Sequence, residues 1–129
     1  MKQTQVTQGI EISIQPDYQE EHSNPQHEKY VFAYHVTIRN TGQNTVQLLR
    51  RHWFIYDSGN TLREVEGEGV IGQTPIIRPG EQFEYNSWTE MRTTIGKMYG
   101  FYTMERITDG ATIEAEIPEF HLVVPFIQN

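Results

Sequence analysis

Cysteine is absent from this chain of 129 residues. Its absence excludes disulfide frameworks, CxxC redox sites, thiolate metal sites and cysteine nucleophiles. Long apolar runs are lacking too, because no segment approaches the roughly 20 apolar residues that a membrane span needs. Residues 1–8 are polar and lack the basic and then apolar pattern of a signal peptide. The sequence therefore predicts a cytoplasmic protein that does not bind membranes.

Basic residues are few. Ten Lys and Arg stand against 17 Asp and Glu, which gives a formal net charge of −7. The longest basic run is Arg50-Arg51. Nucleic-acid binding depends on several Lys and Arg contacts to phosphate, so nucleic acid is not an expected partner.

The sequence also lacks helical periodicity, since no stretch of a dozen residues repeats with the period of a helix. The dominant period is two. In the segment 30–38 it places large apolar residues on one face of a strand, namely Tyr30, Phe32, Tyr34, Val36 and Ile38. Strands are predicted for residues 10–14 (ended by Pro16), 30–38, 46–57, 61–66, 82–88, 96–107, 111–117 and 120–126.

Turn-forming residues separate these strands at the spacing of roughly 8–12 residues that is typical of sandwiches and barrels. The stretch Asn40 to Asn44 is predicted to be a hairpin connection, and Asp109-Gly110 is a second hairpin signal. The length fits one domain, because domains of about 100–150 residues are the commonest. The sequence thus predicts one all-β domain, 1–129, in which the sheets are antiparallel.

Six blocks of residues resemble one known family in order along the chain. They are Tyr30-x-Phe32-x-Tyr34-x-Val36-x-Ile38-x-Asn40, Gln47-Leu48-Leu49-Arg50-Arg51-His52-Trp53, Val65-x-Gly67-x-Gly69-Val70-Ile71-Gly72-Gln73-x-Pro75, Pro79-Gly80-Glu81-x-Phe83-x-Tyr85-x-Ser87, Gly96-x-Met98-x-Gly100-x-Tyr102 and Ile117-Pro118-x-Phe120-x-Leu122. As a set they resemble the ApaG family over residues 10–126, so nearly the whole chain is covered.

The resemblance implies a fibronectin type III-like or immunoglobulin-like β-sandwich, with about seven to nine strands. It also implies a role in protein contacts, because related domains in eukaryotic F-box proteins and in a polymerase-interacting protein are thought to mediate them. The bacterial family is linked to cobalt resistance and magnesium efflux. The resemblance supplies no catalytic site and no cofactor.

The segment Gly67-Glu68-Gly69-Val70-Ile71-Gly72 matches the pattern GxGxxG. In dinucleotide-binding proteins the glycines bring backbone amides to a pyrophosphate at a helix N-terminus, but here Pro75 and β-like residues follow instead. One interpretation is a small anion site formed by the amides around Gly67, Gly69 and Gly72. The other is a β-bulge or strand crossing at which glycine is needed for its backbone.

Five histidines are present, and none forms an HxH or HExxH pattern. If residues 40–44 form a hairpin, His35 and His52 become diagonal neighbours across two strands and could together hold Co²⁺ or Zn²⁺. Arg50 would then lie opposite His35 and oppose a cation. The alternative is that both are structural histidines on polar faces.

The remaining candidates form a predicted partner surface. Arg51 shares the side of Trp53 and can clamp an anion or pack on an aromatic ring, and the segments around Trp88, Tyr99 and Phe101 carry apolar residues beyond those one core face requires. No serine lies in a GxSxG motif, and the carboxylates follow wet strand faces. The sequence therefore predicts a non-enzymatic module without cofactor that binds another protein, and exposed strand edges offer a route to a homodimer. The rival hypothesis is pyrophosphate or nucleotide binding at the glycine-rich loop, with or without a divalent ion.

Overall fold

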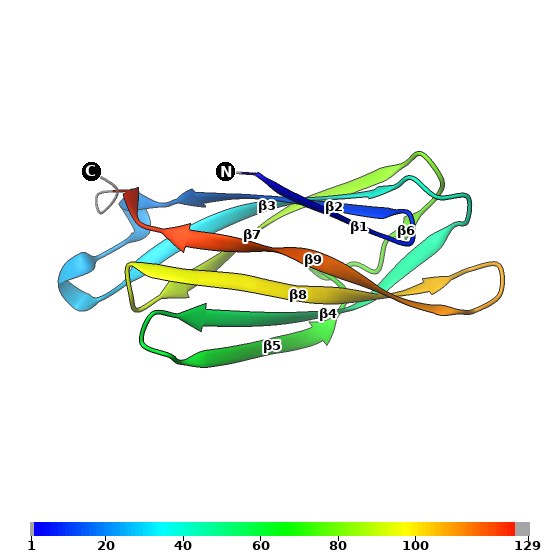
Figure 1. Ribbon diagram of the computed structural model, residues 1–129. Helices are drawn as coiled ribbons and strands as arrows, with labels where there is room; N and C mark the ends of the chain where they lie inside the picture. Colours follow the sequence, from blue (N-terminus) through cyan, green and yellow to red (C-terminus); the bar gives the residue numbers. More distant parts are fainter. Residues whose placement is uncertain (1, 126–129) are drawn as a thin grey trace.

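The computed structural model describes residues 2–125, and these form two antiparallel sheets packed face to face (Figure 1). One sheet has the strand order β1-β2-β3-β7, and the other has the order β5-β4-β8-β9 with the short β6 paired to β4. The elements are β1 (Gln3–Thr7), β2 (Ile10–Tyr18), η1 (Glu20–His22), η2 (Pro25–His27), β3 (Tyr30–Asn40), β4 (Val46–Asp57), β5 (Leu62–Glu68), β6 (Ile76–Ile77), β7 (Gln82–Met91), β8 (Ile95–Arg106) and β9 (Thr112–Val123). The prediction of an all-β, fibronectin type III-like sandwich is confirmed.

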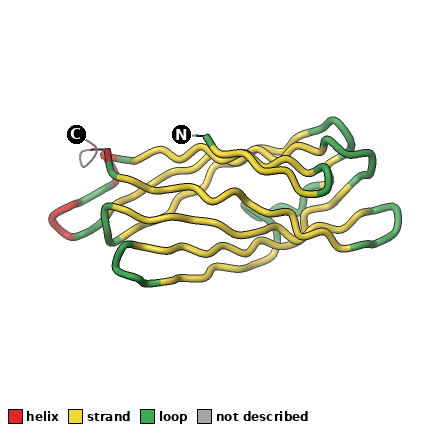
Figure 2. The backbone as a smooth tube through the Cα atoms, viewed as in Figure 1, coloured by secondary structure: helices red, strands yellow, loops and turns green. Residues whose placement is uncertain are grey.

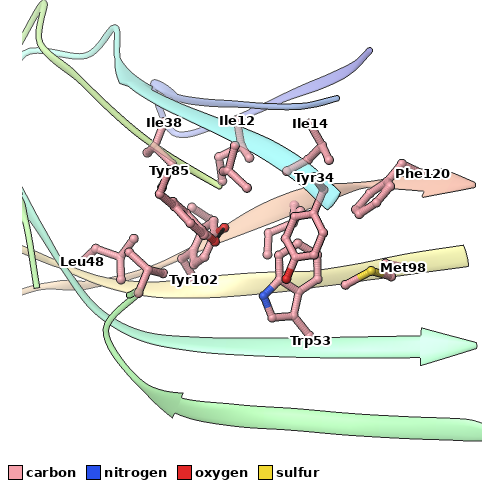
Figure 3. Packing of buried hydrophobic residues seen from close by; sticks show 14 of the residues in the cluster. Ile12, Ile14, Tyr34, Ile38, Leu48, Trp53, Tyr85, Met98, Tyr102 and Phe120 are labelled. Atoms are coloured by element: carbon pink, nitrogen blue, oxygen red, sulfur yellow. Dashed lines mark hydrogen bonds between the residues drawn. The ribbon is translucent and has the colours of Figure 1, made fainter. Parts of the chain in front are cut away.

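The core lies between the two sheets and is formed by alternate residues of nearly every long strand. On β3 the five residues of the predicted apolar face, Tyr30 to Ile38, are all buried, as the period of two requires. Trp53 of β4 and Phe120 of β9 pack edge to face with ring centroids 6.0 Å apart, and Tyr34 meets Trp53 at 5.4 Å (Figure 3). Large interlocking rings therefore join the sheets.

The connection from β3 to β4 is not a hairpin, so that prediction is wrong. β3 pairs with β2 and β7, whereas β4 pairs with β5, β6 and β8 in the other sheet. The buried Asn40 holds the crossing. Its side-chain amide donates to the carbonyl oxygens of Asn44 at 2.7 Å and Ile77 at 3.0 Å, and its Oδ1 accepts from the amide of Gly42. Because these bonds satisfy the backbone where the chain leaves the sheet, the segment can cross the sandwich edge.

The first long strand also extends further than expected, since β2 continues past Pro16 to Tyr18. β1 covers β2 only as far as Ile14, so the end of β2 is an edge strand, where proline is tolerated. Between β2 and β3 lie two single-turn 3₁₀ helices, coloured red in Figure 2. Over residues 2–125 no helix has the length and apolar character to cross a membrane.

The two lateral edges of the sandwich differ. At one edge β1 runs beside β9, and the side chain of Gln5 donates to Oε2 of Glu116 at 2.6 Å while the Glu116 amide donates to Thr7. At the opposite edge β5 and β7 do not pair with each other, and a cleft of about 420 Å³ opens between the sheets. One edge is therefore sealed by the N-terminal strand, and the other is open.

Candidate functional site

The glycine-rich loop between β5 and β6 is a tight turn. The amide of Val70 donates to the carbonyl of Gln73 and the amide of Gln73 donates back to Val70, both at 2.9 Å. The two central residues have positive φ, +43° at Ile71 and +76° at Gly72, which is the signature of a primed hairpin turn. The amide of Gly69 donates to Leu49 at 2.7 Å. Three amides of the loop are thus already used inside the protein.

Arg51 holds this loop from the inner side of β4. Its Nη1 donates to the carbonyl oxygens of Glu68 and Gly69, each at 3.0 Å. A Cβ atom at Gly67 would lie only 3.0 Å from the guanidinium, so Gly67 leaves the room that Arg51 occupies. The structure therefore joins Arg51 to the glycine-rich loop through carbonyl oxygens. This arrangement fits the structural interpretation of the glycines better than an anion site built from their amides.

The open cleft between the sheets, called the edge cleft below, extends from this loop toward β7. Arg63 lies across it and donates from Nη2 to Oγ1 of Thr89 at 3.2 Å and to the carbonyl of Glu90 at 3.1 Å. Within residues 2–125 no carboxylate lies within 4.0 Å of the guanidinium of Arg51 or Arg63. The lining residues are Tyr34, Arg51, Trp53, Ile55, Arg63, Val65, Val70, Ile71, Tyr85, Ser87, Trp88, Thr89, Glu90 and Met98. The cleft thus combines apolar and aromatic side chains with polar ones, among them two arginines and the carboxylate of Glu90.

Tyrosine hydroxyls contribute polar groups to the cleft, at Tyr34 and Tyr85, and to the core beneath it, at Tyr102. Tyr85 and Tyr102 share a short hydrogen bond between their hydroxyls (Figure 3). Burial raises the pKa of Tyr34, Tyr85 and Tyr102, and the positive charge of Arg51 opposes this only in part. The three phenols are therefore neutral over the physiological pH range and act only as hydrogen-bonding groups.

The outer face of the five-stranded sheet carries four stacked rings, which we call the aromatic stripe: His52 and Phe54 of β4 and Tyr99 and Phe101 of β8. The imidazole of His52 stacks between Phe54 at 4.5 Å and Phe101 at 5.1 Å, and Phe54 stacks on Tyr99 at 5.1 Å. Strand register explains the stacking, because His52 lies directly opposite Phe101 and Phe54 lies opposite Tyr99. All four side chains are half-buried.

Glutamates flank the stripe on both sides. From the edge strand β5 come Glu64, Glu66 and Glu68, and from β9 come Glu114, Glu116 and Glu119. Two strong cations, Arg50 and Lys97, share this face. Beside the stripe lies a hollow of about 360 Å³, which we call the stripe groove, lined by Gln5, Phe54, Tyr99, Gly100, Phe101, Glu116, Ile117 and Glu119. A groove rich in aromatic rings and carboxylates accordingly faces solvent.

The two metal candidates lie on different sheets. His35 belongs to β3 and His52 to β4, and these strands do not pair. Their proposed joint metal site followed from the incorrect hairpin and is wrong. His52 approaches Glu66 through Nδ1 at 3.0 Å, while its Nε2 lies 3.5 Å from Glu64 and makes no hydrogen bond. Over the described chain no three His, Asp or Glu residues come together in a way that could hold a metal.

His35 instead pairs with Glu84 across the neighbouring strand β7. Its ring nitrogens lie 3.0 Å from Oε1 of Glu84 and 2.9 Å from Oδ1 of Asn86. The bonds to Glu84 and Asn86 raise the pKa of His35 above its ordinary 6.5, and the bond from His35 lowers the pKa of Glu84 below its ordinary 4.5. Both groups are exposed, so the pair is a surface ion pair of small energy.

The His35–Glu84 pair predicts a specific pH dependence of stability. A raised histidine pKa stabilises the fold below about 6.5 and loses this effect as the pH rises through the folded pKa; a lowered glutamate pKa stabilises above about 4.5. The pair thus stabilises most between about pH 4.5 and 6.5. We expect Glu84→Gln to lower the melting temperature more at pH 5.5 than at pH 8.5, as measured by calorimetry at both values. A decrease of the same size at both pH values would show that the pair contributes nothing.

The predicted partner residues do not form one surface. Tyr99 and Phe101 belong to the aromatic stripe, and Arg51 faces the edge cleft. Trp88, on β7 of the other sheet, lies at the rim of that cleft with 51% of its surface exposed and its ring edge-on to His22 at 5.0 Å. The predicted partner residues therefore lie on two sides of the five-stranded sheet: Tyr99 and Phe101 on its outer face, and Arg51 and Trp88 at the edge cleft.

Three contributors to these surfaces were missed at the level of sequence. The sequence pattern places Phe54 only in a predicted strand and Glu116 on a solvent-facing strand face, and it indicates no site at Arg63. The alternation in 52–54 and 99–101 carried the signal for the stripe, since both segments place rings two residues apart. This alternation indicates the stripe only when β4 is known to pair with β8, and the paired residues of these strands lie some 50 positions apart in the sequence.

Comparison with known proteins shows which family this chain is similar to. The family model described as ApaG domain matches residues 20–106. Protein ApaG of Dechloromonas aromatica is 46% identical over 116 residues, which cover 90% of this chain and 91% of that protein. The chain belongs to the ApaG family. Protein ApaG of Azoarcus sp. (strain BH72) is 44% identical over 92% of this chain and 93% of its own length.

A solved structure agrees with this assignment to the ApaG family. The crystal structure of the ApaA protein of Bordetella pertussis matches with a TM-score of 0.86 and 42% sequence identity, and 95% of each chain is covered. The likeness therefore includes the whole sandwich rather than a local motif. The family resemblance predicted from the six sequence blocks is confirmed.

Proposed function

We propose that this ApaG-family protein is a non-enzymatic, cytoplasmic module that binds another protein through the outer face of its five-stranded sheet. The observation that carries the proposal is the aromatic stripe, which holds four stacked, half-buried rings at a solvent-facing surface. Rings held in place by stacking lose little side-chain entropy when they bind, which is why aromatic residues are enriched at protein interfaces. The stripe groove beside them gives a partner side chain a place to insert.

In this proposal the bound partner, and not a metal ion held by this chain, accounts for the link of the family to cobalt resistance and magnesium efflux. The placement of the two histidines supports an indirect link, because His35 lies with Glu84 and Asn86 on one sheet and His52 is stacked in the stripe on the other. A direct role in metal binding has no comparable support among the described residues.

The second candidate function is binding of pyrophosphate or a nucleotide beside the glycine-rich loop. The observation in its favour is the pair Arg51 and Arg63 in the edge cleft, neither of which has a carboxylate partner in residues 2–125. Against it, Arg51 already donates to two loop carbonyls, and three loop amides are engaged. We therefore rank it below the protein-binding role.

Site-specific photo-crosslinking in cells tests the protein-binding role. A photoreactive phenylalanine analogue at Phe101 is expected to give a discrete crosslinked band, because this ring lies in the stripe. The same analogue at Val6, an exposed apolar residue of β1 on the other sheet (56% exposed), is the matched control. A band at twice the mass of the chain would identify a homodimer, and equal smears from both positions, or no band from Phe101, would contradict the proposal.

A further inference from the structure

The outer face of the five-stranded sheet is built in rows that run across the strands. In one row Glu66, His52, Phe101 and Glu116 lie side by side on β5, β4, β8 and β9. In the next row Glu64, Phe54 and Tyr99 lie side by side, and Glu119 follows beyond the bulge of β8 against β9. Each row therefore has two rings in the middle and a carboxylate at either end.

Lys97 shows what kind of group this arrangement attracts. It occupies the third row, where its Nζ lies 5.7 Å from the ring of Tyr56 and 5.9 Å from the ring of Tyr99. The same Nζ lies 3.4 Å from Oε1 of Glu119. An ammonium group held between ring faces and a carboxylate is a cation–π contact supported by an ion pair. The chain thus places its own cation on the stripe at one end.

The two rows that contain Phe54 and Phe101 have rings and carboxylates but no lysine or arginine. The stripe groove beside them has none among its lining residues either, although Glu116 and Glu119 both border it. The side chain of Gln5 donates to Oε2 of Glu116 and so keeps that carboxylate at the wall of the groove. In the Phe54 row Lys97 already contacts Tyr99 and Glu119. The Phe101 row has similar surroundings without a lysine or arginine from this chain, and its Glu66 lies 3.0 Å from Nδ1 of His52.

Charge decides which class of partner fits. Stacked aromatic platforms also bind single-stranded nucleic acids, but there they occur in positively charged grooves. Here the rings lie between two glutamate strands, so six glutamates on this face outnumber Arg50 and Lys97, which lie in the rows at either end, and the whole chain has a net charge of −7. Phosphate is repelled and a cation is attracted. Arginine suits the site better than lysine because its planar guanidinium both stacks on rings and binds carboxylates through two donors.

The spacing of the rows adds a geometric requirement. Successive rows are two residues apart along β4 and β8, which corresponds to about 6.6–6.8 Å. An extended chain that lies along these strands presents every second side chain to the sheet at this same interval. Two arginines at alternate positions of such a segment therefore reach the Phe101 row and the Phe54 row together.

We propose that the partner of this protein presents an extended segment with arginines at alternate positions (Arg-x-Arg). One guanidinium stacks on the Phe101 row and pairs with Glu66 and Glu116, and the other stacks on the Phe54 row beside Lys97 and pairs with Glu64. The inference rests on the proposed protein-binding function and names the chemistry of the partner. It assigns Phe54 and Phe101 to stacking, and Glu66 and Glu116 to charge pairing.

Defined peptides test the proposal by amide NMR titration of the whole chain. The probe is acetyl-Gly-Arg-Ser-Arg-Gly-amide. The controls are the same peptide with citrulline in place of both arginines, the isomer acetyl-Gly-Arg-Arg-Ser-Gly-amide, and spermidine. We expect saturable shifts centred on Phe54, Tyr99 and Phe101 with the Arg-x-Arg peptide. We expect at least tenfold weaker binding for the citrulline peptide, which has lost the charge, and about threefold to tenfold weaker binding for the isomer.

Protein variants locate the charge contribution. Glu66→Gln with Glu116→Gln removes the two carboxylates of the Phe101 row while keeping their shape, and should weaken the Arg-x-Arg peptide about fivefold to tenfold. Glu20→Gln in η1 is the control, since it changes charge by one unit in the other layer of the sandwich, and should leave the affinity within about twofold. Thermal melts of both variants verify that they are folded.

Each outcome is decisive. Equal affinity of the arginine and citrulline peptides, equal affinity of the isomer, or spermidine binding as tight as the peptide would overturn the inference. If the analogue at Phe101 crosslinks a partner while the peptides fail, the protein-binding role stands and the arginine segment is wrong. If both experiments fail, both proposals fall.

Discussion

Replacing Gly100 by alanine is expected to lower the free energy of unfolding by about 3 kcal/mol or more, and the melting temperature by roughly 10 °C. A Cβ atom at this position would lie only 2.0 Å from the backbone oxygen of His52 and 3.1 Å from Cα of Trp53. Both atoms belong to the backbone of β4, the central strand paired with β8, so neither can move without breaking the ladder. Urea unfolding followed by far-UV circular dichroism measures the change.

Gly59→Ala serves as the control for Gly100→Ala. Gly59 lies in the exposed turn after β4, and a Cβ there would meet only the side-chain oxygen of Asp57 at 3.3 Å. Its replacement should change stability by less than about 1 kcal/mol. A Gly100→Ala protein as stable as this control would show that β4 and β8 are not packed as closely as described. Because Gly100 lies between Tyr99 and Phe101, the same result would also weaken the case for an ordered aromatic stripe.

Replacing Gly69 by aspartate is expected to cost about 3 kcal/mol in unfolding free energy, whatever its effect on ligands. Gly69 has φ of +62°, and a Cβ there would lie 2.2 Å from the carbonyl oxygen of Gln73 across the tight turn. Strain in the left-handed region and a clash with the backbone therefore act together. The same urea titration tests this, and a Gly69→Asp protein of unchanged stability would contradict a structural role for the glycine.

Gly72→Asp separates the structural role of the loop from the anion hypothesis. Gly72 also has positive φ, +76°, but nothing lies within 4 Å of a Cβ placed there. Aspartate tolerates this conformation better than most residues, so a loss of only about 1 kcal/mol is expected. The variant stays folded and brings a carboxylate to the loop. If the wild-type protein binds pyrophosphate and the Gly72→Asp variant does not, the result supports anion binding at the loop. Gly69→Asp cannot give this support, because it also destabilises the fold.

The core was predictable from sequence because burial leaves a local record. Every second residue of β3 faces the other sheet, so the alternation from Tyr30 to Ile38 identified its inner face without any knowledge of strand pairing. Family resemblance then supplied the sandwich. Neither source depends on which strands are neighbours.

The candidate sites were harder to predict because they depend on pairing. Asn40 to Asn44 has the composition of a hairpin, yet the chain crosses between sheets there, held by the bond from Asn40 to Ile77. That contact spans 37 positions in the sequence. The incorrect hairpin places His35 beside His52, whereas the true neighbour of His52 across the strands is Phe101. Local turn chemistry does not distinguish a hairpin from a crossing when the deciding partner lies so far away.

The crossing at Asn40 also shapes how the chain reaches this fold. Because β3 and β4 belong to different sheets, β3 pairs with β7 and β4 pairs with β8 only after those later strands are available. Paired residues such as His35 and Asn86 are 51 positions apart in the sequence. Neither sheet can be completed from one half of the chain. The entropy of closing these long loops is lost before most of the ladder forms, which is typical of sandwiches that fold in milliseconds to seconds. A nascent chain that has emerged only through β5 would expose unpaired edges of both β3 and β4, and β7 and β8 are the strands that cover them.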